Sequence, residues 1–238
     1  MAATLSQPHP EHPYSETHVK LGDYQFAQHE NWRQAGLLAL IGIGIEPGAA
    51  DVFARHAADE LFSEIDEVGI RDGANLVVEG FDFAPTFSIW TTIEECLNPP
   101  VIWEKGRGWF TTEPFSEPET FDFPEGIGPM NIYRMYHEEM ESLVKHIPTI
   151  KKAQFWMTFS DNYLKHLEVL QNVGMTRIDE VEFNGQKIVP IQFLKALLPD
   201  PGSLGPLTKG KTCIGVIARG IKDGQRKQVY IYNICDHE

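Results

Sequence analysis

The stretch from Leu197 to Gly215 places the tightest constraint on how this chain can fold. Residues 205–212 read GPLTKGKT and match the phosphate-loop pattern G-x-x-x-x-G-K-[ST] letter for letter. A phosphate loop follows a strand and opens a helix, because the helix N-terminus holds the phosphates. Here a run with helical spacing, 191–198, stops at a proline, and a β-branched run, 213–218, follows. The order helix, loop, strand is reversed, and it disfavours a nucleotide hydrolase.

The same loop predicts an anion site of a simpler kind. Lys209, Lys211 and Thr212 lie on a glycine-containing loop where a strand begins. In an extended segment, residues two apart point to the same side, so both ammonium groups are expected to face one carboxylate. The alternative is a pair of solvated surface lysines. We expect 207–211 to be loop with a strand after it, and we take these three residues as candidate substrate-binding residues.

Composition excludes several classes of protein. The net charge of −14 over 238 residues disfavours binding to nucleic acid or to an anionic membrane surface, because both need basic patches. The three cysteines contain no CxxC pair and fit a reducing cytoplasm. No apolar run approaches the roughly 20 residues of a membrane helix, and the N-terminus lacks the order of a signal peptide. The sequence therefore indicates a cytoplasmic globular protein.

The first segments predict a tail followed by a strand–turn–helix unit. Residues 1–22 have no apolar period and indicate a mobile tail, whose histidines His9, His12 and His18 are expected to be solvated rather than to bind metal. A helix over 23–34, a buried strand over 37–43, a turn at 44–48 and a helix over 49–62 follow. The helix is expected to bury Val52, Phe53, Ala57 and Leu61 on one side.

The strand–turn–helix order is similar to a dinucleotide-binding fingerprint, but two details differ. The glycines at 42, 44 and 48 give G-x-G-x-x-x-G, and Glu46 would put a carboxylate where a pyrophosphate should lie. A tight strand-to-helix turn is favoured over a fingerprint.

The remaining segments predict an α+β fold, with a largely antiparallel mixed sheet and helices on one face. The expected elements are a hairpin over 67–72 and 76–79, a helix over 86–97, a hairpin over 101–104 and 108–111, a surface loop over 114–128, strands over 131–138 and 152–159, a helix from an Asp161 N-cap to Gly174, an Asn-Gly turn within 182–187, and a closing hairpin over 213–221 and 228–236.

Two clusters are candidates for chemistry. His137, followed by Glu138 and Glu139, lies at a predicted strand end and could act with Glu138 as a general acid–base group, although a histidine bonded to a neighbour explains the pattern equally well. Cys235 and His237 share one face of the last strand, with Asp236 between them. A metal or nucleophilic site there lacks a third ligand or a base, so we predict no metal site.

Several longer runs are similar to a known family. They are YHEE at 136–139, FWMT at 155–158, NVGMT at 172–176, KIVP at 187–190, the segments 192–201 and 203–215, and YIYNICDH at 230–237. Together they resemble the saccharopine dehydrogenase family, in particular its polyamine branch, the carboxynorspermidine dehydrogenases, also called synthases. Segment 80–128 resembles other bacterial saccharopine dehydrogenase-like proteins. The resemblance extends from about Gly36 to the end of the chain.

The resemblance implies an activity and a domain plan. In such enzymes a diamine condenses with aspartate semialdehyde and the imine is reduced by hydride from NADPH. The resemblance assigns 23–47 to the end of a cofactor domain, a remnant strand–helix unit, and 48–238 to a substrate-binding and dimerisation domain. Glu46, Pro47 and Gly48 are then candidate cofactor contacts, with NADP bound in the complete enzyme. The implied partners are a small amino-acid or diamine substrate, a second copy, and possibly a separate cofactor-domain chain.

The resemblance makes the chain the substrate-side domain of such an NADP-dependent reductase, and two alternatives remain open beside it. The chain could be a non-catalytic dimerisation fragment that keeps the fold without the chemistry, or, more weakly, a phosphate-loop nucleotide binder. Phe155, Trp156 and Phe159 suggest apolar surface that a homodimer would cover.

Overall fold

The computed structural model describes residues 23–237, without the side chains at 23, 24, 89, 90 and 94. The predicted tail at 1–22, with its three histidines, lies outside the described residues. The helices are α1 (Asp23–Ala27), α2 (His29–Gln34), α3 (Ala49–His56), α4 (Ile89–Leu97), α5 (Glu139–His146), α6 (Asp161–Asn172) and α7 (Pro190–Leu197). A π-helical turn (Ala57–Leu61) extends α3, and two 3₁₀ turns (Pro201–Ser203 and Gly205–Leu207) precede the last strands. No helix among the described residues is long and apolar enough to cross a membrane.

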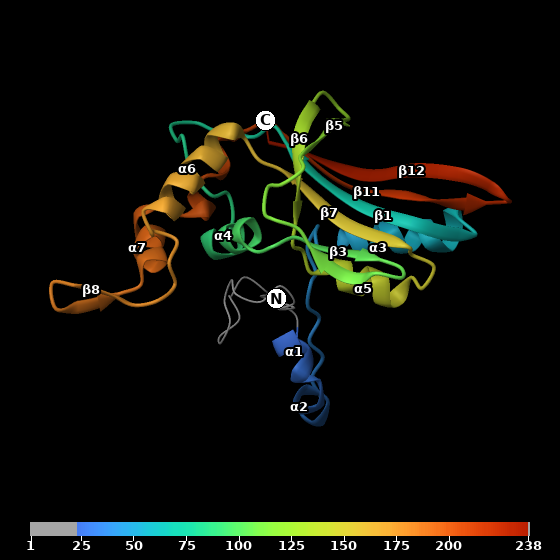
Figure 1. Ribbon diagram of the computed structural model, residues 1–238, viewed down its shortest axis with the longest axis horizontal. Coiled ribbons are helices and arrows are strands. Elements are labelled where there is room, and N and C mark those ends of the chain that lie inside the picture. Colours follow the sequence, from blue (N-terminus) through green and yellow to red (C-terminus); the bar gives the residue numbers. More distant parts are fainter. Residues whose placement is uncertain (1–22, 238) are drawn as a thin grey trace.

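Eight strands form one mixed, mostly antiparallel sheet, as predicted (Figure 1). The strands of the structure are β1 (Glu64–Ala74), β2 (Val77–Val78), β3 (Val101–Glu104), β4 (Gly108–Thr111), β5 (Glu119–Phe123), β6 (Gly128–Met135), β7 (Lys152–Thr158), β8 (Val181–Phe183), β9 (Gln186–Ile188), β10 (Thr208–Lys209), β11 (Lys211–Lys222) and β12 (Gln225–Asp236). The order is β12-β11-β1-β7-β3-β4, and β5 joins through β6, which also pairs with β7. Only β1 and β7 run parallel within this sheet.

Helices α3 and α5 cover one face of the sheet and enclose the main core (Figure 1). Ala50 and Ala54 of α3 are fully buried, and such small side chains let the helix lie close to β11. Met140 and Leu143 of α5 complete this layer. Helices α4, α6 and α7 gather beyond one end of the sheet.

The predicted hairpin over 67–79 is wrong, because β1 continues without a turn to Ala74. It pairs with β11 along almost its whole length, and the short β2 pairs with β10 instead. Gly73 therefore serves packing rather than a turn. A Cβ at this position would lie 2.3 Å from the ring of Phe123, closer than real Cβ contacts allow.

The predicted buried strand over 37–43 is also wrong. Leu37, Leu38, Leu40 and Ile43 are exposed, with Leu38 at 89 %, and the described residues give this segment no strand partner beyond one isolated bridge between Gly44 and Gly48. An apolar run becomes a buried strand only where neighbouring strands satisfy its backbone. Val52, expected on the buried side of its helix, is exposed as well.

The predicted surface loop over 114–128 contains a strand. Residues of β5 pair with β6, and Phe123 is buried with Trp156 in a second core cluster on the opposite face of the sheet. The alternation of Phe121 and Phe123 with acidic residues is the period-two pattern of a strand, and the proline-rich part before it and the turn at 124–127 after it are loop.

The segment from Leu207 to Lys211 differs in part from the predicted loop. Thr208 and Lys209 form β10, Gly210 has φ +108°, and β11 begins at Lys211. A strand rather than a helix follows the lysine, so the geometry of a phosphate loop is absent here.

Other local predictions are confirmed. The hairpins β3–β4, β8–β9 and β11–β12 form, and Asn184 and Gly185 both have positive φ, as a two-residue hairpin turn requires. The helix predicted from Asp161 forms, but its N-cap is Ser160, whose hydroxyl accepts a hydrogen bond from the Tyr163 amide at 3.1 Å.

Replacing Ser160 by alanine is expected to lower the free energy of unfolding by about 1 kcal/mol, because one amide of the first turn loses its acceptor. Urea unfolding followed by circular dichroism measures the change. Ser63→Ala, at an exposed position outside a helix, is the matched control. Equal losses in both variants would show that the cap does not stabilise α6.

Candidate active site

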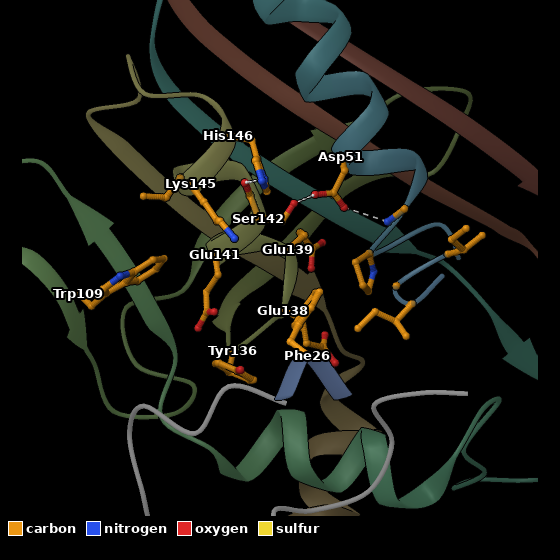
Figure 2. Close-up of a pocket in the computed structure, with 16 residues that line it drawn as sticks. Phe26, Asp51, Trp109, Tyr136, Glu138, Glu139, Glu141, Ser142, Lys145 and His146 are labelled. Carbon is orange, nitrogen blue, oxygen red and sulfur yellow. Dashed lines mark hydrogen bonds between the residues drawn. The ribbon is translucent and has the colours of Figure 1, made fainter. Parts of the chain in front are cut away.

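A cavity of about 880 Å³ opens between the turn before α3 and helix α5 (Figure 2). Among the described residues, its walls come from α1, the segment from Ile41 into the start of α3, β4, and the segment from the end of β6 through α5. The lining residues are Phe26, Ile41, Gly42, Ile43, Pro47, Gly48, Asp51, Trp109, Tyr136, Glu138, Glu139, Glu141, Ser142, Val144, Lys145 and His146. This size is typical of a small-molecule site.

The turn at 44–48 is held in a fixed shape by its own hydrogen bonds. Gly48 has φ +139°, and a Cβ there would lie 2.3 Å from the Gly44 carbonyl oxygen, so only glycine fits. The Gly48 amide donates to Asp51 Oδ2 at 3.0 Å, and Ser142 Oγ donates to Asp51 Oδ1 at 2.7 Å. Asp51 thus joins the turn to α5 across the cavity (Figure 2).

The predicted strand over 131–138 ends at Met135, and His137 lies in the short connection before α5. The His137 ring stacks on Phe155 of β7, with centroids 4.2 Å apart, and its side chain is only 4 % exposed. Its Nδ1 is hydrogen-bonded to Glu139 and lies 3.4 Å from Glu138 Oε2, while Nε2 lies 3.6 Å from Glu95 Oε1. One imidazole is therefore surrounded by three carboxyl groups.

Two further carboxyl groups complete the cluster. Asp72 follows Val68 and Ile70 by period two at the end of β1, on the face that the helices cover. Glu46 of the turn shares a hydrogen bond with it. We call Glu46, Asp72, Glu95, His137, Glu138 and Glu139 the acid–histidine cluster.

Burial and mutual repulsion keep protons on this cluster at neutral pH. Burial, followed by the neighbouring carboxylates, raises the pKa of Glu46 to about 10 and that of Glu95 to about 8. Burial raises the pKa of Asp72 to about 7 and also raises the pKa of Glu138. Burial alone would lower the pKa of His137, but Glu139 and Glu138 raise it well above its ordinary value. Such a group of shifted pKa values is typical of a site that transfers protons.

A metal ion is a possible occupant on geometry alone, since ligand atoms of His137, Glu138 and Glu139 lie within 4.8 Å of one another. Against this, His137 Nδ1 is already hydrogen-bonded to Glu139 Oε2, which engages two of the ligand atoms with each other. We assign no metal here.

The turn at 44–48 does not fit a dinucleotide pyrophosphate. A phosphate cradle needs free backbone amides, but the Gly48 amide donates to Asp51, and those of Ala49 and Ala50 donate to the Gly44 and Ile45 carbonyls. The Asp51 carboxylate at the start of α3 would also repel phosphate. If Glu46, Pro47 and Gly48 contact a cofactor, an uncharged part of it is the better match.

The structure brings some predicted site residues together and leaves others apart. Pro47, Gly48 and Glu138 line the cavity, and Glu46 and His137 lie directly behind it. His137 itself is absent from the lining, so Glu138 is the member of the predicted acid–base pair that faces the cavity.

The predicted anion site at Lys209, Lys211 and Thr212 does not line this cavity. Lys211 Nζ lies 3.6 Å from Asp236 Oδ2 and donates to the Glu125 carbonyl oxygen at 3.3 Å, and Thr212 Oγ1 lies 3.3 Å from His237 Nε2. The positive φ of Gly210 interrupts the extended backbone on which convergence of the two lysines depended. A role in substrate binding for these three residues stays a prediction.

The sequence reasoning missed α5, which supplies Glu139, Glu141, Ser142 and Lys145 to the cavity. A signal was present: Met140, Leu143, Val144 and Ile147 follow the i, i+3, i+4, i+7 spacing of a buried helix face. Glu95 was also missed, because nothing local marks one acidic residue of α4 as buried.

Comparison with known proteins assigns the chain to a family. Residues 44–238 match the family model of the saccharopine dehydrogenase C-terminal domain. The chain belongs to the saccharopine dehydrogenase family. It is 48 % identical over 214 residues to a carboxyaminopropylagmatine dehydrogenase of Synechocystis, covering 90 % of this chain and 53 % of that protein. It is 38 % identical over 217 residues to a carboxynorspermidine synthase of Vibrio cholerae, covering 91 % and 51 %.

The fold agrees with this family assignment. Apo saccharopine dehydrogenase (L-Glu forming) from Saccharomyces cerevisiae superposes with a TM-score of 0.52 at 10 % identity, covering 84 % of this chain and 61 % of that one. The family expected from the sequence is thus confirmed. This saccharopine dehydrogenase-family chain spans about half the length of the curated relatives it matches.

Proposed function

We propose that this chain is the substrate-side domain of an NADP-dependent reductase that reduces the imine of a diamine and aspartate semialdehyde in polyamine biosynthesis. Its relatives, a carboxyaminopropylagmatine dehydrogenase and a carboxynorspermidine synthase, support this proposal. The observation that carries the proposal is a cavity of small-molecule size backed by the proton-holding acid–histidine cluster.

The cluster accounts for the proton of this reaction. Reduction of an imine adds a hydride to carbon and a proton to nitrogen. Glu138 lines the cavity and has a raised pKa, so in its protonated form it can protonate the imine nitrogen. His137 acts behind it as a positioning residue, and its positive charge keeps the pKa of Glu138 from rising further. The hydride would come from NADPH in the complete enzyme, and the turn at 44–48 would not hold its phosphates because the amides there are already bonded.

The exposed apolar run at 37–43 supports the presence of a further domain or a partner chain that packs against it. Four large apolar side chains there face solvent, which is unusual for a free surface. A cofactor-binding part, in the same polypeptide or in a separate chain, would cover them and stand next to the cavity mouth, which Ile41 and Ile43 help to line. The assignment of 23–47 to the end of a cofactor domain stays a prediction on this basis.

A homodimer also stays a prediction, but the apolar surface that was expected to form its interface is not exposed. Phe155 and Trp156 are 1 % and 0 % exposed within the chain, and Phe159 packs on the main core, so these aromatics offer no free apolar surface. A purely structural dimerisation fragment remains the alternative function. The shifted pKa values at the cavity favour chemistry over that alternative.

The test is NADPH oxidation by the complete gene product, with aspartate semialdehyde and either 1,3-diaminopropane or agmatine. We expect oxidation only when both the aldehyde and an amine are present, and a carboxylated amine as the product by mass spectrometry. Absence of turnover with every amine, in a preparation that binds NADPH, would exclude the reductase and leave the structural fragment.

A further inference from the structure

We infer that Glu139 and Trp109 form a subsite for the far cationic end of the substrate, a second ammonium or a guanidinium group. The inference rests on the proposed function and adds the residues that would distinguish a diamine from a monoamine. Trp109 was not a predicted site residue.

Hydrogen-bond accounting at Glu139 points to a missing donor. The residue lines the cavity and is 1 % exposed. One carboxyl oxygen, Oε2, is bonded to His137, but the other, Oε1, is buried with no partner among the described residues. Buried acceptors without donors are rare in proteins, and a ligand is one way to satisfy them.

The charges around the cavity select a cation as that donor. Among the described residues, Asp51, Glu138, Glu139 and Glu141 line it, and Lys145 and His146 are the basic side chains of the lining. Glu46 and Glu95 behind the wall hold their protons at neutral pH, so the preference for a cation comes from the carboxyl groups of the lining. Ammonium and guanidinium groups only donate hydrogen bonds. They can therefore satisfy a buried acceptor without bringing an unsatisfied acceptor of their own into the site.

An aromatic wall faces the same space. Trp109 of β4 and Tyr136 line the cavity, and Glu141 lies between them in Figure 2, while Glu138 and Glu139 occupy its centre. Trp109 is fixed by packing against Trp103, with ring centroids 5.3 Å apart. A cation close to the face of a tryptophan is stabilised by the ring, and tryptophan is the best of the aromatic residues for this.

The rest of the lining fits an aliphatic spacer. Phe26, Ile41, Ile43 and Val144 are apolar, and they leave a path along which a methylene chain loses contact with water. The ligand class that matches all three observations is a short alkylamine with a second cationic end.

Two variants and two amines test the subsite. In the reductase assay we expect 1,3-diaminopropane to exceed propylamine in kcat/KM by at least about tenfold. Because Glu139 also bonds His137, Glu139→Gln should lower kcat/KM for both amines, but for the diamine it should lower it by a further factor of about tenfold to a hundredfold. Trp109→Leu, which spares the buried cluster, should cost the diamine about threefold to thirtyfold. Glu182→Gln, on the exposed hairpin β8–β9, is the control and should change neither amine.

Calorimetry of diamine binding to the chain separates the possible failures. If no amine is reduced but the diamine binds and Glu139→Gln abolishes binding, the subsite stands and the proposed reaction falls. If reduction occurs but both variants treat the two amines alike, the subsite is wrong and the reaction stands. A third outcome would also overturn the subsite: Zn²⁺ or Mn²⁺ displaces the diamine, activates the enzyme, and does neither in Glu139→Gln. That result would show a metal site instead. Should Glu139→Gln fail to fold, Trp109→Leu alone decides.

Discussion

Replacing His137 by glutamine is expected to lower kcat/KM for imine reduction by about 10²–10⁴-fold and to move the alkaline limb of the pH profile upward. His137 lies between Glu138, Glu139 and Glu95, and its positive charge lowers the pKa of Glu138 and that of Glu95. Without that charge Glu138 becomes a weaker acid and gives its proton to the imine less readily. The limb moves because deprotonation of Glu138 then needs a higher pH.

Steady-state kinetics from about pH 6 to about pH 10 measure both effects. The shift of the limb is the decisive readout, since a merely structural defect would lower activity at every pH alike. His56→Gln, on the exposed side of α3, is the matched control and should leave the profile unchanged. A His137→Gln enzyme with wild-type kcat/KM, or with reduced activity and an unmoved limb, would remove His137 from the mechanism. Circular dichroism confirms that each variant is folded.

Local signals explain why much of the fold could be predicted from the sequence. The turns at Asn184-Gly185 and Asp223-Gly224 specify their hairpins through residues that accept positive φ, and the observed pairs agree. The reversed order around Lys211 is also local, and it correctly argued against a phosphate loop. In the sequence, Gly73 cannot be told from a glycine in a turn. In the structure it is required because the ring of Phe123 lies where a Cβ would be. That ring comes from a strand about 50 residues further along the chain.

The site was predicted less well because its members converge from distant segments. Glu46, Asp72, Glu95 and Glu139 come from a turn, a strand and two helices, and no spacing in the sequence links them. His137 and Glu138 were found because they are adjacent to one another. Lys209 and Lys211 were chosen for the same reason. The contacts of Lys211 with Asp236 and with Glu125, the latter 86 positions away, lie outside any local pattern. Closeness in the sequence therefore led to two members of the acid–histidine cluster, His137 and Glu138, and also to a pair of lysines that lie outside the cavity.

The buried carboxyl groups make the free energy of unfolding depend on pH, and the effect can be measured at Glu95 alone. In the unfolded chain Glu95 loses its proton near the ordinary pKa of 4.5, whereas in the folded protein burial holds the proton up to about pH 8. Between these values the unfolded state binds fewer protons than the folded state, so the free energy of unfolding falls as pH rises. Each retained proton contributes a slope of about 1.4 kcal/mol per pH unit. The raised pKa of His137 adds a slope of the same sign at higher pH.

Glu95→Gln keeps the shape of a protonated glutamate and removes this titration. We therefore expect the variant to lose up to about 1.4 kcal/mol per pH unit of the wild-type slope between about pH 5 and about pH 8. The two proteins should differ little near pH 5, and the variant should be the more stable one near pH 8, because there the unfolded wild type gains stability by releasing a proton that its folded state largely keeps. Urea unfolding across this range measures both curves, with Glu182→Gln as the exposed control. Parallel curves for wild type and Glu95→Gln would mean that Glu95 is ionised in the folded protein, and the cluster would then carry more negative charge than the described contacts of His137 can balance.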